Sequence, residues 1–228
     1  MDAHITNTPA KARTDVSPPG TAPAARPPAI APGTVRRLGL GLAAGTLVWA
    51  VSIFLFDPTA GGTEGRIGDL AGLAFQLGLF GLLAVQMRTR AGGTSRVSAV
   101  MLKVEVVLLA LASAWSLLHA ILPEAAGDGV VLAVLDVFWP LSMLGMFVIS
   151  VKLVLARRWR GPLRWWPLVA ESWGVVTVPV FALLGEAASR WVGGGHLLVG
   201  YAALGLLLVW RPELTFAGQE SPAVQDGK

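Results

Sequence analysis

Long apolar runs separated by short polar loops are the feature that most restricts the fold of this chain. A helix of about 20 apolar residues can cross a lipid bilayer, and six runs approach or exceed that length. The sixth is the weakest, because Gly193–Gly195 are expected to lie in the loop before it. The sequence therefore predicts an all-α polytopic integral membrane protein, a bundle of six transmembrane helices. The spans are expected at about 38–56, 67–87, 98–122, 130–155, 166–187 and 192–210.

The composition indicates that lipid is the main solvent of the chain. Hydrophobic residues make up 54% of the 228 residues and charged residues 14%, against roughly 25% charged in an ordinary soluble domain. The absence of cysteine excludes thiol nucleophiles, disulfides and cysteine-ligated metals. The bias toward Ala, Gly, Arg and Pro is typical of a high-GC bacterial coding sequence, so a bacterial plasma membrane is the expected location.

Two tails flank the predicted membrane domain, which covers residues 36–212. Residues 1–35 are rich in Pro and Ala and lack apolar periodicity, which predicts a disordered cytoplasmic tail. Residues 213–228 are predicted to form a short cytoplasmic C-terminal tail. Arg36 and Arg37 fit a twin-arginine export signal, but no A-x-A cleavage site follows the first run, which favours an uncleaved span.

The distribution of basic residues predicts the orientation, because Lys and Arg concentrate in cytoplasmic loops. If both termini are cytoplasmic, the outer loops hold only Arg66 and Arg190. The inner segments then hold Arg36, Arg37, Arg88, Arg90, Arg96, Arg157, Arg158, Arg160, Arg164 and Arg211. Two G-x-x-x-G spacings, Gly41 with Gly45 and Gly68 with Gly72, predict close helix approach or arise by chance in a Gly-rich chain.

Four ionisable residues form a predicted outer layer, within roughly 10 Å of the outer interface at 1.5 Å of helix rise per residue. They are Asp69, His119, Asp136 and His196. One interpretation is solvation at the interface, and a second is a polar cavity for substrate or protons. The third is a divalent metal site, or two histidines ligating a haem, although no H-x-x-H or H-E-x-x-H spacing supports it.

Two glutamates, Glu105 and Glu171, form a predicted inner layer six or seven residues from the cytoplasmic ends of their spans. Each is expected either to pair with Lys103 or Lys152 across helices, or to lie close enough to the other to share a proton. In the second case, with His119 farther along the third span, the glutamates outline a proton path.

A cluster of Arg and Trp precedes the fifth span. The arginines are Arg157, Arg158, Arg160 and Arg164. Contact with anionic lipid headgroups explains this mixture better than nucleic-acid binding, because such belts anchor membrane proteins at the interface. No P-loop, G-x-S-x-G elbow or protein-kinase signature occurs, and no catalytic set is assigned.

The first functional hypothesis is a small transporter-like or proton-linked carrier that uses Asp136, His119, Glu105 and Glu171. The second is a non-catalytic membrane subunit that assembles as a homo- or hetero-oligomer through Gly-rich faces. The third is a haem- or metal-binding membrane protein that relies on His119 and His196, with Asp69 and Asp136 as further candidate ligands. The hypotheses differ in one structural consequence: a carrier requires a polar cavity reaching mid-membrane, whereas a scaffold requires only a closed bundle.

Overall fold

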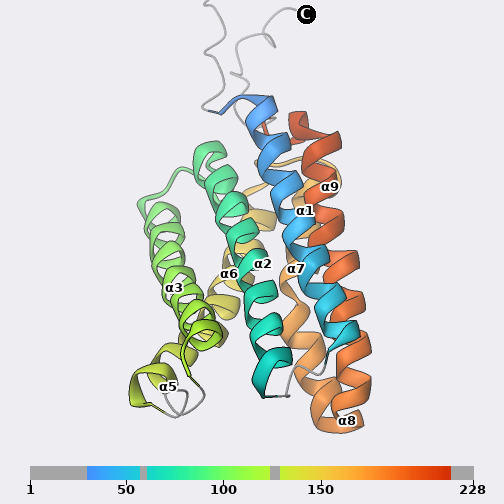
Figure 1. Ribbon diagram of the computed structural model, residues 1–228. Helices are drawn as coiled ribbons and strands as arrows, with labels where there is room; N and C mark the ends of the chain where they lie inside the picture. Colours follow the sequence, from blue (N-terminus) through green and yellow to red (C-terminus); the bar gives the residue numbers. More distant parts are fainter. Residues whose placement is uncertain (1–29, 57–60, 124–128, 217–228) are drawn as a thin grey trace, which may run out of the picture.

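The computed structural model describes residues 30–56, 61–123 and 129–216, and every regular element in these ranges is a helix (Figure 1). Five helical stretches are long and apolar enough to cross a membrane. The predicted all-α fold is confirmed, and the stretches fit a multi-pass membrane protein by length and composition. Most of the predicted tails lies outside the described residues, at 1–29 and 217–228.

Three long helices form the first half of the bundle. Helix α1 begins with Pro32 in its first turn, where proline's missing N–H costs nothing, and so starts six residues before the expected span. Ser95 caps α3, its hydroxyl accepting from the backbone N–H of Ser98 at 3.2 Å. The helices are α1 (Pro32–Leu55), α2 (Gly62–Thr89) and α3 (Arg96–Ile121).

The fourth stretch consists of two helices, α5 (Val130–Asp136) and α6 (Phe138–Ala156). Val137 between them keeps helical dihedral angles, φ −59° and ψ −28°, so the two form one interrupted run. Pro140 explains the interruption, because it has no N–H to donate to the carbonyl of Asp136 one turn earlier. The interruption therefore lies beside one of the candidate site residues.

The last stretch, Pro162–Trp210, is 49 residues long and folds back on itself. It comprises α7 (Pro162–Glu171), α8 (Trp173–Leu197), the π-helix η1 (Leu198–Ala202) and α9 (Ala203–Trp210), followed by the 3-10 turn η2 (Pro212–Thr215). Gly185 has φ 82° and ψ −177°, a conformation that favours glycine. Trp173 Nε1 donates to the carbonyl of Gly193 at 2.9 Å, and a straight helix would separate these residues by about 30 Å. The chain therefore reverses at Gly185 and forms two antiparallel arms.

The position of this turn corrects the expectation for Gly193–Gly195. They lie within α8, and Gly193 and Gly194 are buried. The reversal comes earlier, at Gly185, inside the expected fifth span rather than between 187 and 192. Pro179 also lies within α8, where it has no N–H to donate to the carbonyl of Val175 four residues earlier.

Helix α1 packs between α2 and α9, and glycines set how closely the backbones approach (Figure 1). A Cβ atom on Gly45 would lie 2.4 Å from the carbonyl oxygen of Ala74 in α2. A Cβ atom on Gly39 would lie 2.7 Å from the carbonyl oxygen of Gly205 in α9. Gly41 and Gly68, the first members of the two G-x-x-x-G pairs, face open space. Only one glycine of each pair therefore lies against a neighbouring helix.

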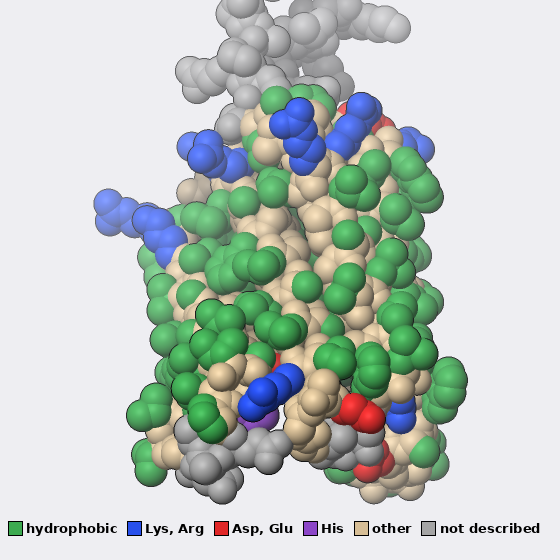
Figure 2. Space-filling view, viewed as in Figure 1, with side chains coloured by type: hydrophobic (Ala, Val, Ile, Leu, Met, Phe, Trp, Pro, Cys, Tyr) green, Lys and Arg blue, Asp and Glu red, His purple; other side chains and the backbone are tan. Residues whose placement is uncertain are grey.

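The two ends of the bundle differ in charge (Figure 2). Lys and Arg side chains gather at the end where α1 begins, called here the arginine end, and apolar side chains cover the middle. Acidic side chains and a histidine are visible at the opposite end, called here the carboxylate end. Two arginines at the carboxylate end bond to carbonyls where helices terminate: Arg190 Nη2 to Phe54 at 3.0 Å and Arg66 Nη2 to Leu122 at 3.3 Å.

Replacing Gly45 with Ala is expected to lower the free energy of unfolding by about 1–3 kcal/mol, because the added methyl group collides with the α2 backbone. Gly41→Ala is the matched control, since it adds the same methyl group to open space on the same helix. Thermal unfolding in detergent, followed by loss of the monodisperse peak in size-exclusion chromatography, measures both variants. Equal melting temperatures for the two variants would contradict the packing described.

Candidate functional site

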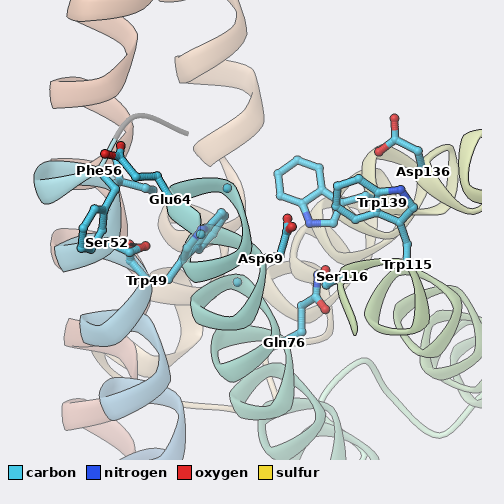
Figure 3. Close-up of a pocket in the computed structure, with 14 residues that line it drawn as sticks. Trp49, Ser52, Phe56, Glu64, Asp69, Gln76, Trp115, Ser116, Asp136 and Trp139 are labelled. Atoms are coloured by element: carbon cyan, nitrogen blue, oxygen red, sulfur yellow. Dashed lines mark hydrogen bonds between the residues drawn. The ribbon is translucent and has the colours of Figure 1, made fainter. Parts of the chain in front are cut away.

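A cavity of about 240 Å³ enters the bundle from the carboxylate end (Figure 3). Glycines of α2 leave part of this space, because Gly65, Gly68 and Gly72 present no side chain to it. This outer cavity is lined by Trp49, Ser52, Ile53, Phe56, Glu64, Gly65, Gly68, Asp69, Gly72, Gln76, Trp115, Ser116, Asp136 and Trp139. Four separate segments of the chain, α1, α2, α3 and the α5–α6 run, therefore build its wall.

Carboxylates from α2 and α5 lie around the outer part of the cavity. Asp69 Oδ2 is 2.7 Å from Nδ1 of His119, whose ring stacks on Trp115 with centroids 5.0 Å apart. Asp136 is exposed at the rim, on the side of Trp139 (Figure 3). Two of the four residues assigned to the outer layer, Asp69 and Asp136, thus line one cavity, and a third, His119, bonds to Asp69.

His196, the fourth residue of that layer, lies elsewhere. Its Nε2 atom is 3.1 Å from the hydroxyl of Ser172, within the hairpin formed by α7 and α8. Among the described residues, no group of three or more His, Asp and Glu side chains is arranged to hold a metal ion. His119 and His196 therefore have different partners, and the structure adds no support for a shared haem or metal.

Gln76 forms the floor of the outer cavity, together with Ser116. Its Nε2 donates to Ser116 Oγ at 3.0 Å, and that hydroxyl in turn donates to the carbonyl of Ala112 at 3.4 Å. This chain of donors fixes the amide orientation and leaves Gln76 Oε1 without a hydrogen-bond partner, although the side chain is only 2% exposed. A buried acceptor without a partner is costly, and it is a common sign of a ligand or water site.

A second, inner cavity of about 20 Å³ lies beyond this floor. It has room for about one water molecule. Three residues line both cavities: Trp49, Gln76 and Trp139. The inner cavity is also lined by Ser142, Glu171 and Tyr201, so a thin wall of side chains separates the outer cavity from a buried carboxyl group.

The two inner-layer glutamates are buried near this inner cavity. Tyr201 donates its hydroxyl hydrogen to Glu171 Oε2 at 2.5 Å, and Ser142 donates to Glu105 Oε1 at 2.6 Å. Glu171 Oε1 has no hydrogen-bond partner. Ser142 links the two sites, because it bonds to Glu105 and lines the same inner cavity as Glu171. Within the described ranges, neither glutamate forms an ion pair with a lysine, so the expected Glu–Lys pairs are absent there.

Local irregularities in the helices place these side chains. Glu171 is the last residue of α7, directly before the interruption at Ser172, where ψ is 0°. Tyr201 lies in η1, and π-helical turns of this kind occur frequently at functional sites. On α6, Gly145 makes room for the Glu105 carboxylate, since a Cβ atom there would collide with Oε2. The sequence indicated that the two glutamates lie within apolar helices, but it gave no sign of the π-helix.

Three tryptophans from different helices form a cluster, called here the tryptophan wall: Trp49 and Trp139 line both cavities, and Trp173 lines the inner one. The ring centroids of Trp49 and Trp173 are 5.8 Å apart, as are those of Trp139 and Trp173, and Trp49 and Trp139 are 6.1 Å apart. Trp49 also stacks on Phe75 at 4.8 Å, and Phe75 meets the ring of Tyr201 at 4.9 Å. Sequence reasoning missed these tryptophans as site residues, because a tryptophan in a span is first interpreted as packing.

The arginine cluster (Arg157, Arg158, Arg160 and Arg164), which extends from the end of α6 into the first turn of α7, lies outside both cavities. Arg164 Nε donates to the carbonyl of Val154 at 3.1 Å, and its guanidinium lies 4.6 Å from the ring of Trp165. Arg157 ends α6 with φ 55°. Between them, Trp159 is fully buried and its Nε1 donates to Thr89 Oγ1 at 3.0 Å. The cluster is therefore anchored to the bundle at its arginine end.

No protein-family model, curated protein or solved structure matches the chain.

Ser142→Ala is expected to reduce the free energy of unfolding by about 1–3 kcal/mol, because it removes a hydrogen bond of 2.6 Å to the buried Glu105 carboxyl. Ser150→Ala is the control on the same helix: Ser150 is also buried, but its hydroxyl bonds only to the carbonyl of Phe147 within α6. Thermal melts of the two variants in the same detergent test the difference. A loss no larger for Ser142→Ala than for Ser150→Ala would refute the role assigned to Ser142.

Proposed function

We propose that the chain is a six-span, proton-linked carrier of small solutes. The single observation that supports this function best is the outer cavity, which runs from the carboxylate end to Gln76 and is separated only by side chains from Glu171. Gln76 is the fifteenth of the 28 residues of α2, so the cavity reaches halfway along that helix. A subunit with a purely structural role needs no such opening.

The buried carboxyl groups supply the proton-binding part of the proposal. Ionisable groups inside a membrane bundle are costly, and in pumps and transporters they mark proton relays. Ser142, which bonds to Glu105, lines the same inner cavity as Glu171, and the Tyr201 hydroxyl bonds to Glu171. Between these groups and the bulk solvent lie Gln76, the Asp69–His119 pair and the outer cavity. A proton can thus reach the glutamates from the carboxylate end through hydrogen-bonding side chains and a few water molecules.

The same proposal includes six membrane crossings with both termini in the cytoplasm of a bacterial cell. The two arms of the last stretch, residues 162–184 and 186–210, are each about 35 Å long at 1.5 Å per residue. That length exceeds the roughly 30 Å of a bilayer core. The arginine end then faces the cytoplasm, in agreement with the positive-inside rule.

In this orientation the arginine cluster lies at the cytoplasmic headgroup region. We propose that Arg157, Arg158, Arg160 and Arg164 contact anionic lipid headgroups there. Trp165 next to them is exposed, at 51%, and suits the interface because its ring is amphipathic. Basic residues near an anionic leaflet each gain about 1 kcal/mol.

Single cysteines test the six crossings directly, because the natural chain contains no cysteine. In intact cells, a membrane-impermeant maleimide is expected to label Glu186→Cys, which follows the turn at Gly185, and not Thr94→Cys or Arg160→Cys. The latter two become reactive after the membrane is opened. Val107→Cys, whose side chain faces outward from α3, is the unreactive control within a span. Labelling of position 94 or 160 from outside, or no labelling of 186, would overturn the topology.

Glu171→Gln is expected to abolish proton-driven charge movement, because the amide keeps the size and the acceptor for Tyr201 but cannot take up a proton. Proteoliposomes adsorbed on a solid-supported membrane are subjected to a pH jump, and the transient current is recorded. Glu186→Gln is the matched control, since Glu186 lies at the carboxylate end but outside both cavities. Wild-type currents that persist undiminished in Glu171→Gln would exclude Glu171 as the proton-binding group.

A further inference from the structure

We infer that the ligand of the outer cavity is a small organic cation, with a quaternary ammonium or protonated amine as its recognised group. The inference rests on the proposed function, because it names the substrate class of that carrier. Four properties of the outer cavity support it: the charge of the wall, the aromatic side chains in the wall, the acceptor character of the unpaired polar atoms, and the volume of the cavity.

The charge of the wall favours a cation. Glu64, Asp69 and Asp136 line the cavity, and no Lys or Arg among the described residues does so. The nearest arginine in the sequence, Arg66, directs its guanidinium to the carbonyl of Leu122. His119 bonds to Asp69 from behind and is not part of the lining. An anionic substrate would therefore meet repulsion at the entrance, whereas a cation is attracted there.

The aromatic surface favours an organic cation over a metal ion. Trp49, Trp115, Trp139 and Phe56 contribute rings to the same wall. Aromatic faces attract ammonium groups through the quadrupole of the ring, and tryptophan is the strongest partner. Ca²⁺ and Mg²⁺ instead require several oxygen ligands at about 2.0–2.6 Å, and no acidic group of that kind is assembled among the described residues.

The unused hydrogen-bonding groups at the floor accept rather than donate. Gln76 uses its amide N–H toward Ser116, and its Oε1 atom lacks a partner in a residue that is 98% buried and lines both cavities. Beyond it, Glu171 Oε1 also lacks a partner. A ligand in the outer cavity that carries N–H or O–H groups beside its positive charge would satisfy Gln76 Oε1. A carboxylate or phosphate would not.

The size of the cavity restricts the class further. Its volume of about 240 Å³ lies below the range of about 300–1,000 Å³ typical of sites for drug-sized ligands. The lining is also more apolar than polar, since rings and glycines outnumber charged groups. A compact amine with a few carbon atoms therefore fits better than a polyamine or a large aromatic dye.

Choline and its uncharged carbon analogue 3,3-dimethylbutan-1-ol test the inference, because they share shape and hydroxyl group and differ in charge. Binding of radiolabelled choline is measured on the full chain in lipid nanodiscs, with the alcohol as competitor. Saturable choline binding that the alcohol does not displace at equal concentration is the expected result. No saturable binding of choline, or equal competition by the alcohol, would overturn the inference.

Matched variants assign the binding to the cavity. Trp139→Leu is expected to weaken choline binding about 3- to 30-fold, the range of a cation–π contact. Trp191→Leu is the control and is expected to leave choline binding unchanged, because Trp191 is exposed and lies outside the cavity. Asp136→Asn, at the exposed rim where folding is not at risk, is expected to weaken binding, whereas Glu186→Gln is not. Unchanged binding in both Trp139→Leu and Asp136→Asn would place the cation elsewhere and refute the site.

The pH-jump current on the same preparation separates this inference from the proposed function. If choline fails to bind while wild-type currents still depend on Glu171, the substrate class is wrong and the carrier stands. If choline binds as expected but no current depends on Glu171, the cation site stands and the proton linkage fails.

Discussion

The structure depends on one constraint: carboxyl groups inside an apolar helix bundle need hydrogen-bond partners supplied by the bundle itself. Burying a polar group without a partner costs several kcal/mol, and burying a charge costs more. Tyr201 and Ser142 each supply a hydrogen bond to one carboxyl oxygen, of Glu171 and Glu105 respectively. Both partners come from helices other than those that carry the glutamates. The packing of α3 on α6, and of α7 on η1, is therefore tied to two short hydrogen bonds at the centre of the molecule.

The same constraint accounts for the irregular backbone around the site. The π-helix η1 holds Tyr201, and the interruption at Ser172 directly follows Glu171. These distortions lie on opposite arms of the hairpin that reverses at Gly185. A regular pair of helices would present different side chains at this level, because a π-turn shifts the register of every residue after it. The hairpin therefore combines apolar outer surfaces with an inner pair of polar groups.

Counting residues along the spans brought one predicted pair together and misplaced another residue. Depth follows from counting residues along a helix at a fixed rise, so Asp69 and His119 were placed in one layer and form a hydrogen bond at 2.7 Å. His196 was placed in the same layer, but it lies 11 residues past the turn at Gly185 and bonds to Ser172, the residue after Glu171, so its expected depth was wrong. The turn at Gly185 was misplaced by a few residues, because the polar residues Glu186, Ser189 and Arg190 follow the glycine and hydropathy locates the loop among them.

The tryptophan wall explains how one bundle can keep the outer cavity and the buried glutamates apart and still connect them. Trp49 lies against the outer cavity, the inner cavity and a third pocket between α1 and α8, and Trp173 lies against the last two. The rings of Trp49 and Trp139 meet through aromatic contacts of about 0.5–1.5 kcal/mol per pair, so shifting them costs less than breaking a helix. Trp139 and Trp173 each lie close to a helix interruption, at Val137 and Ser172. The proposed carrier would need a barrier that yields at low cost, and the two tryptophans beside helix interruptions are the residues at which such a barrier would open.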